Sequence, residues 1–167
     1  MMRVSIVQLE SDIGSAYSFT FTTSANEIDL VHETYSIEGK IEVKGSIVNT
    51  GKVYRVEGVI YCKKSFQCDR CLEHFVHDQK HSFDESYKKE AEDQNENVNY
   101  FNGDALDLTD LVRDVILLSQ PLNNICSPDC RGLCMKCGAN LNETECGCDR
   151  HIVDPRLAAL QEALNKE

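Results

Sequence analysis

The sequence contains no apolar run that approaches the roughly 18 residues of a membrane-spanning helix, so we do not expect it to span a bilayer. Its start, Met1 to Ile6, lacks the long apolar core of a secretory signal. We therefore expect a cytoplasmic protein, in which thiols stay reduced. No Gly-rich phosphate loop, Ser-centred nucleophile turn or His-Glu metalloprotease pair occurs, so the sequence indicates a binding module and not an enzyme, with no evident small-molecule substrate.

The sequence also lacks the basic excess of a generic nucleic-acid binder, because 17 Lys+Arg face 28 Asp+Glu and the formal net charge is −11. One window reverses the sign, since residues 40 to 70 hold seven basic side chains and three acidic ones. The seven are Lys40, Lys44, Lys52, Arg55, Lys63, Lys64 and Arg70. This window is where we would expect any RNA contact. The alternative is that these side chains are scattered on the solvent faces of strands.

Residues 35 to 87 show the alternation of apolar and polar residues that is typical of antiparallel strands. We expect one strand before a turn at 49–52, a second over 53–62, and a third from Phe75 to Tyr87. The expected inner-face residues of the first two strands are Ile37, Ile41, Val43, Ile47, Tyr54, Val56, Ile60 and Cys62. The fold class is therefore α+β, with an antiparallel sheet or a partly open barrel as its core. The first 30 residues give no clear pattern.

The remainder divides into a polar connector and a helical, cysteine-rich part. Residues 88–103 are acid-rich with almost no aliphatic side chains, which indicates a flexible connector. A helix with an apolar stripe is expected to begin near Asp107 and to end before Pro121, and a last helix is expected to begin at Asp154. We thus expect a β-rich core at 1–87, the connector at 88–103, and a C-terminal part at 104–167.

Six of the nine cysteines lie between residues 126 and 148, and their density indicates a structural zinc site. Cys134 and Cys137 form a C-x2-C knuckle followed by a glycine, which makes them the safest ligand pair. Either of two further pairs can complete the four ligands. These pairs are Cys126 with Cys130, and Cys146 with Cys148. We expect about one Zn²⁺ ion per chain, bound in a closed tetrahedral site.

A second C-x2-C, formed by Cys68 and Cys71 around Arg70, falls at an expected connection between strands. Three interpretations remain open. The pair can be a redox dithiol, with Arg70 favouring the thiolate. It can join a second metal site with Cys62, spare C-terminal thiols, or His74 and His77. It can also be a structural or recognition turn.

Three elements together resemble the bacterial YceD family of large ribosomal RNA subunit accumulation proteins. They are the Cys68-x-Arg70-Cys71-Leu72 turn followed by Phe75, the run from Cys130 to Asn142 followed by Cys146-x-Cys148, and the closing run from Asp154 to Leu160. The resemblance covers most of the chain from about residue 35 onward. Met135 departs from the pattern, since proline is usual there, and metal binding should tolerate the change.

The resemblance implies a role in the accumulation or maturation of large-subunit ribosomal RNA, and it brings no catalytic residues. The first hypothesis is a non-enzymatic assembly factor whose acidic surface engages a basic ribosomal protein or the pre-ribosomal large subunit. The second is direct binding of ribosomal RNA through the 40–70 window, with Lys63, Lys64 and Arg70 as contacts. The third is a thiol oxidoreductase that uses Cys68 and Cys71.

Overall fold

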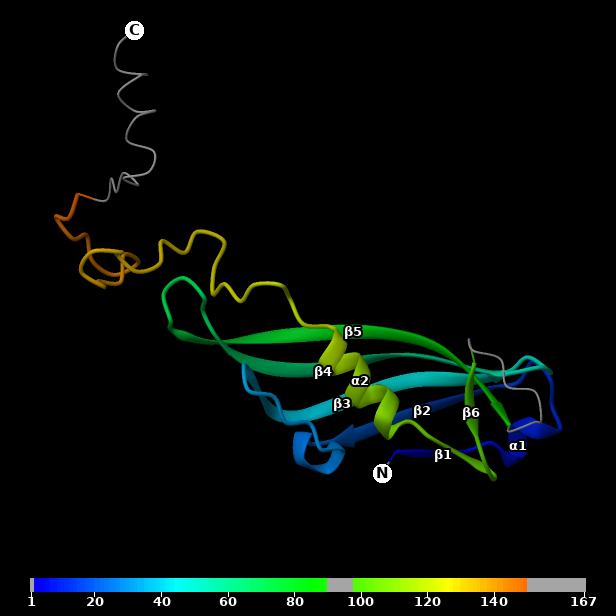
Figure 1. The fold of residues 1–167 in the computed structure, drawn as a ribbon. Coiled ribbons are helices and arrows are strands. Elements are labelled where there is room, and N and C mark those ends of the chain that lie inside the picture. The colour runs from blue at the N-terminus through cyan, green and yellow to red at the C-terminus, as the bar shows by residue number, and fades with distance from the viewer. Residues whose placement is uncertain (1, 90–97, 150–167) are drawn as a thin grey trace, which may run out of the picture. The chain divides into compact units, whose positions relative to one another are not determined.

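The computed structural model describes residues 2–89 and 98–149. Its main feature is an open five-stranded sheet in the order β2-β3-β4-β5-β6 (Figure 1). The strands are β2 (Ala16–Thr23), β3 (Tyr35–Asn49), β4 (Tyr54–Gln67), β5 (His74–Lys89) and β6 (Asn99–Phe101). Neighbouring strands are antiparallel, except that β5 and β6 are parallel. The α+β class and the antiparallel core that the sequence predicts are confirmed.

Smaller elements complete the fold. A two-stranded sheet pairs β1 (Arg3–Ser5) with β7 (Ala105–Asp107), and Val4 lies opposite Leu106. The short helices are α1 (Val7–Glu10) and the 3-10 helix η1 (Ala25–Ile28), and the longer one is α2 (Thr109–Leu118). No helix within the described ranges has the length and apolar character needed to cross a membrane.

The expected alternation holds along β3, β4 and β5. Val43 pairs with Ile60, and both side chains are fully buried on the face of the sheet that packs against α2, which we call the inner face. The apolar stripe of α2 is buried against this face, with Leu108, Val112 and Ile116 all at 0% exposure. The opposite, outer face carries Tyr61 and Lys63, because side chains alternate along β4.

One lysine lies in this core. Lys64 has 0% exposure. Its Nζ atom donates a hydrogen bond to the carbonyl oxygen of Ile116 at 3.0 Å and lies 4.7 Å from the centre of the Tyr35 ring. The carbonyl belongs to the last turn of α2, where a cation is electrostatically favoured. Lys64 therefore joins β4 to the carboxyl end of α2, and it cannot contact RNA as the sequence suggested.

The chain divides into two compact units along different lines from the expected domains. The sheet unit comprises Met1–Gln67 and His74–Asn124, and the cysteine unit comprises Cys68–Glu73 and Ile125–Glu167. The helix α2 thus belongs to the sheet unit, because its apolar stripe completes that core. The ends of the expected 88–103 connector lie in β5 and β6, while its middle and the expected helix at Asp154 lie outside the described residues.

The burial of Lys64 predicts a pH-dependent stability. Desolvation lowers the pKa of its ammonium group from the ordinary value of 10.5, with a smaller opposing effect from Cys62. The folded state therefore releases this proton at a lower pH than the unfolded chain, so raising the pH toward about 10.4 favours folding. We expect the free energy of unfolding of the wild type, relative to Lys64→Met, to increase over this range in urea titrations followed by circular dichroism.

The neighbouring Lys63 provides the matched control, because it is exposed on the other face of the same strand. Lys63→Met should leave the pH dependence of the unfolding free energy unchanged. A wild-type chain whose stability relative to Lys64→Met stays constant as the pH rises would contradict a buried ammonium group.

Candidate metal centres

Eight of the nine cysteines converge into two clusters within the cysteine unit. The first cluster consists of Cys68, Cys71, Cys126 and Cys130, and the second of Cys134, Cys137, Cys146 and Cys148. In each cluster all four sulfur atoms lie within 4.8 Å of one another. Each cluster can therefore offer four thiolate ligands to one metal ion.

The sulfur–sulfur distances favour metal ligation over disulfides. In the first cluster, the Sγ atoms of Cys68 and Cys130 are 3.9 Å apart, and those of Cys71 and Cys126 are 3.7 Å apart. A disulfide requires about 2.05 Å. A tetrahedral ion with four bonds of about 2.3 Å to sulfur places its ligands about 3.8 Å apart. These two sulfur–sulfur distances in the first cluster thus already match the edge length of a tetrahedral tetrathiolate site.

The two C-x2-C turns share one backbone geometry. The amide of Leu72 donates to the carbonyl of Cys68 at 2.9 Å, and the amide of Gly138 donates to that of Cys134 at 2.8 Å. Each turn then closes with a second bond, from Cys68 to Glu73 and from Cys134 to Ala139. These two turns are therefore equivalent knuckles that present paired sulfurs in the same way.

The residue after each knuckle takes a left-handed conformation, with φ of 61° at Leu72 and 73° at Gly138. Glycine adopts this conformation without steric cost, whereas a leucine loses about 1 kcal/mol or more. The first knuckle tolerates this cost even though the Leu72 side chain is 54% exposed. Burial in the protein core therefore does not explain why a leucine occupies this left-handed position.

Hydrogen bonds to sulfur favour the thiolate form at selected positions. Burial opposes ionisation of Cys68, but the backbone N–H groups of Cys126, Cys71 and Arg70 lower the pKa of its thiol to about 6. In the second cluster the backbone N–H groups of Cys137 and Lys136 lower the pKa of the Cys134 thiol to about 6. Each knuckle therefore supplies at least one sulfur that is ready to bind a cation near neutral pH.

Cys126 and Cys148 are held protonated when no cation is present. Desolvation, followed by hydrogen bonding to neighbouring thiols, raises the pKa of Cys126 to about 12. Interaction with Cys137 is the largest cause that raises the pKa of Cys148 to about 12. Several thiolates confined together repel one another, and a bound divalent cation removes that repulsion.

The segment between the two clusters is fixed by Arg70 and Gly132. The Arg70 guanidinium donates to the carbonyl oxygens of Cys130 at 3.0 Å and Pro128 at 3.4 Å. The amide of Leu133 in turn donates to the Arg70 carbonyl at 2.9 Å. Gly132 has a φ of 72°, and a Cβ there would lie 2.8 Å from the Arg70 carbonyl oxygen. Arg70 is thus a positioning residue of the first cluster, and its guanidinium is engaged within the protein.

Asn142 follows the second knuckle in the chain, and its side chain supports the first cluster. Its side-chain oxygen accepts a hydrogen bond from the amide of Arg131 at 2.7 Å, and its Nδ2 donates to the Cys130 sulfur at 3.4 Å. This donation is the largest cause that lowers the pKa of the Cys130 thiol. The sequence placed Gly132 and Asn142 only within the run from Cys130 to Asn142 that carries the family resemblance, and assigned neither residue a role of its own.

The structure resolves the alternatives that the sequence left open. It brings Cys134 and Cys137 together with Cys146 and Cys148, while Cys126 and Cys130 join Cys68 and Cys71. The structure thus offers two candidate sites, where we expected about one ion per chain. Cys62, buried in the sheet core, joins neither cluster, and the histidines considered for the second site, His74 and His77, lie on β5 in the sheet unit.

Two metal equivalents per chain are the first prediction from this geometry. Titration with Co²⁺, followed through thiolate-to-metal charge-transfer absorption, should saturate at two ions. Cys71→Ser and Cys137→Ser should each abolish one tetrathiolate site and leave the other, because the two clusters share no ligand. Cys62→Ser is the control and should retain both. Saturation at one ion in the wild type would show that the clusters do not act as separate sites.

Gly132 gives a second prediction. Gly132→Ala places a methyl group against the Arg70 carbonyl and imposes an unfavourable backbone conformation, so the chain should lose metal to a chelator faster than the wild type. Gly147→Ala is the matched control, because a Cβ there meets nothing within 4 Å. Equal chelator-induced loss rates in the two variants would contradict the close packing of Gly132 on Arg70.

Comparisons with known proteins cover much of both units. The family described as large ribosomal RNA subunit accumulation protein YceD matches residues 56–163. A chloroplastic homologue of this protein from Arabidopsis thaliana is 41% identical over 49 residues, which are 29% of this chain and 15% of the relative. Its counterpart in Zea mays is 48% identical over 44 residues, 26% of this chain and 15% of the relative.

A bacterial relative extends the comparison. An uncharacterized protein of Mycobacterium tuberculosis is 39% identical over 64 residues, which are 38% of this chain and 30% of that protein. The chain therefore spans less than a third of the length of the curated relatives it matches. No solved structure matches it. Since the family match covers more than half of the sequence and includes both C-x2-C knuckles, the chain belongs to the YceD family of large ribosomal RNA subunit accumulation proteins.

Proposed function

We propose that this protein is a non-enzymatic factor that supports the accumulation of large-subunit ribosomal RNA by binding a basic ribosomal protein, free or within the pre-ribosomal particle. The family description names this RNA. The observation that carries the binding mode is the net charge of −11. Ribosomal proteins are strongly basic, and opposite net charges accelerate and steer their encounter with an acidic factor.

Acidic side chains gather on one part of the sheet unit. A hollow of about 790 Å³ lies among β5, β6, β7 and α2. Its acidic lining residues are Glu85, Asp104, Asp107, Asp110 and Asp114. Tyr100 and Phe101 line the same hollow and offer flat apolar surface beside the carboxylates. This combination suits a Lys- or Arg-rich segment, whose charged heads pair with carboxylates while their aliphatic stems lie on rings.

We further propose that both cysteine clusters hold structural Zn²⁺. Four cysteine ligands with tetrahedral spacing are the preferred set for this ion, and a site closed by four protein ligands leaves no position for a substrate. Zinc in this role stabilises the cysteine unit, whose described residues contribute no member of the hydrophobic core. Such sites need reduced thiols, consistent with a cytoplasmic location.

Incorporation of Cys68 and Cys71 into the first cluster argues against the oxidoreductase hypothesis. Three of its four cysteines are buried, with exposures of 0% for Cys68, 4% for Cys71 and 6% for Cys130. A redox dithiol needs one sulfur that a substrate disulfide can reach. Metal ligation and burial both remove that access.

Affinity capture from cells tests the protein partner. The tagged chain should retain a basic large-subunit ribosomal protein at low salt and lose most of it at about 0.5 M salt, because exposed charge pairs are screened. Nuclease treatment should leave the interaction intact if the protein is contacted directly. Absence of any ribosomal protein at both salt concentrations would contradict the proposal.

Two charge-matched variants sharpen this test. The first combines Asp104→Asn, Asp110→Asn and Asp114→Asn in the acidic hollow. The second combines Asp12→Asn, Glu33→Gln and Glu38→Gln, which are exposed acids elsewhere on the sheet unit. Capture should fall at least several-fold for the first variant only, since both lose the same net charge. Equal losses would show that total charge and not the hollow determines binding.

A further inference from the structure

We propose that the outer face of the sheet, around Tyr61, is a binding site for single-stranded RNA. This inference goes beyond the protein partner proposed above, and its test uses purified chain and RNA alone. It starts from the 40–70 window, which the structure separates into three environments. Lys64 is buried and Arg70 lies in the cysteine unit, whereas Lys40, Lys44 and Lys63 remain exposed on the sheet.

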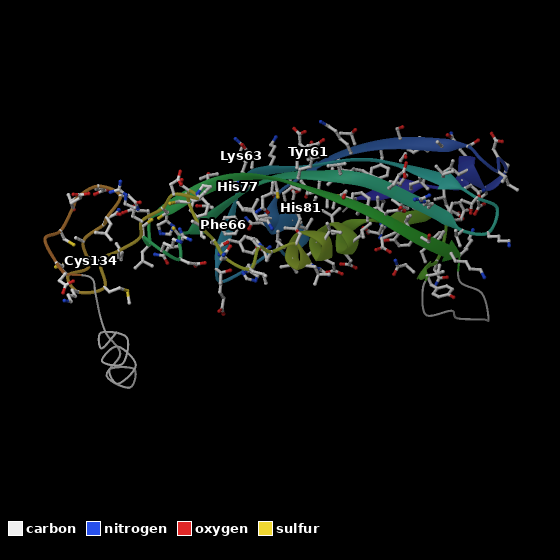
Figure 2. The ribbon with its side chains drawn as sticks, turned by 90° about the horizontal axis from the view of Figure 1, so that it is seen from above. Tyr61, Lys63, Phe66, His77, His81 and Cys134 are labelled. Carbon is white, nitrogen blue, oxygen red and sulfur yellow. The ribbon has the colours of Figure 1, made fainter. Side chains whose placement is uncertain are left out.

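Strand pairing brings a fourth lysine to the same place. Lys80 on β5 lies directly opposite Tyr61 on β4, so both side chains project from the outer face. The Nζ atoms of Lys44 and Lys80 lie 5.6 and 5.9 Å from the centre of the Tyr61 ring. Figure 2 shows Tyr61 and Lys63 on the side of the sheet away from α2. An exposed aromatic ring therefore lies among ammonium groups on an otherwise acidic protein.

The surface is open and hollowed. Tyr61 is 40% exposed, although it is a large aromatic side chain in the middle of a long strand. Beside it lies a hollow of about 390 Å³ whose lining includes Lys40, Lys44, Lys63 and Gln79. The inner face of the same strands is covered by α2 and the core. The outer face is therefore the one on which side chains held at fixed strand positions are open to a ligand.

The local charge balance favours an anionic ligand. Glu42 pairs with Lys44 at 3.0 Å, and Asp78 pairs with Lys63 at 3.5 Å. Within the described part of the chain, Lys40 and Lys80 form no ion pair. Two lysines without an ion pair thus lie near the ring, against one further carboxylate, that of Glu38 opposite Lys63, and the paired lysines are also more than half exposed. A phosphate can recruit them at little cost, because exposed ion pairs are weak.

Single-stranded RNA satisfies both features at once. Its bases expose flat faces that stack on tyrosine, and its phosphates pair with lysines a few ångströms away. An acidic peptide would use the ammonium groups but leave the ring unused, and a duplex would withhold its base faces. Stacking together with phosphate pairing is how single-strand-binding sheets hold RNA without reading its sequence.

The test measures anisotropy of a labelled oligouridylate of about 12 nucleotides, titrated with the zinc-loaded chain at several salt concentrations. Affinity should fall with salt, with a log–log slope of about −2 if three phosphates are neutralised. Tyr61→Ala should weaken binding on the order of tenfold. Tyr61→Phe should bind like the wild type, because the ring is kept. The Tyr61 side chain is 40% exposed, so circular dichroism should show that both variants fold like the wild type.

Matched controls isolate the site. Tyr17→Ala removes another exposed strand tyrosine, on the opposite face of the sheet, and should not weaken binding. Lys44→Gln combined with Lys80→Gln should weaken binding and make the salt slope shallower. Lys52→Gln, in the turn between β3 and β4, should do neither.

Three outcomes would overturn the inference. The first is no binding of the oligonucleotide even at about 50 mM salt. The second is equal affinity of Tyr61→Ala and Tyr17→Ala. The third is binding of duplex RNA or a polyglutamate peptide as tight as that of the single strand, which would assign the face to general anion attraction. None of these outcomes bears on capture of a ribosomal protein through the acidic hollow.

Discussion

Mutual repulsion among crowded thiolates is the constraint on which the cysteine unit depends. Four sulfurs confined within 4.8 Å cannot all ionise unless a cation lies among them, and in each cluster the protein lowers the pKa of one or more thiols while others stay protonated. If an ion binds, its binding free energy therefore also contributes to the folding of this unit. The knuckles, the Arg70 contacts and the Asn142 hydrogen bonds arrange the four sulfurs of the first cluster, which can then hold an ion.

The sheet unit depends on ordinary apolar burial and is organised so that its two faces differ. Its inner face and α2 form the core, and among the described residues Lys64, at the helix end, is the one charged side chain that is fully buried. Its outer face gathers lysines around Tyr61, whereas the carboxylates of the acidic hollow lie toward β6, β7 and α2. A molecule with a net charge of −11 can thus present opposite potentials at separate places. Such a factor would suit an assembly intermediate in which basic protein and RNA are exposed together.

Much of the sheet could be predicted from the sequence, because long strands carry a strong alternation. β3, β4, β5 and α2 follow their apolar patterns closely. β1 could not be predicted in the same way, since three residues give no periodicity and its partner β7 lies about a hundred positions away. Lys64 shows the limit of such patterns. Lys64 lies an even number of residues after Ile60 and Cys62 on β4, so strand alternation places its side chain on the inner face. Its positive charge, taken alone, would instead suggest an exposed position.

The sequence singled out the six cysteines of residues 126–148 as candidate ligands and left Cys68 and Cys71 open, and it did not predict how the eight gather into two clusters. Spacing along the chain predicts knuckles well because each one is local. It says little about which knuckle joins which, because that depends on how distant segments return to one another. The number of cysteines was the available signal for two sites, since four cysteine pairs supply eight sulfurs and eight sulfurs fill two tetrahedral sites.

The composition of the first cluster has a consequence for synthesis of the chain. Cys68 and Cys71 are synthesised with the β4–β5 turn, whereas Cys126 and Cys130 follow some 55 residues later. A nascent polypeptide consequently carries the Cys68–Cys71 pair without its partner cysteines during translation of everything from β5 to α2. The first centre can close only after residue 130 has been added, and the second only after residue 148. Metal binding at these clusters would therefore come late in the synthesis of the chain.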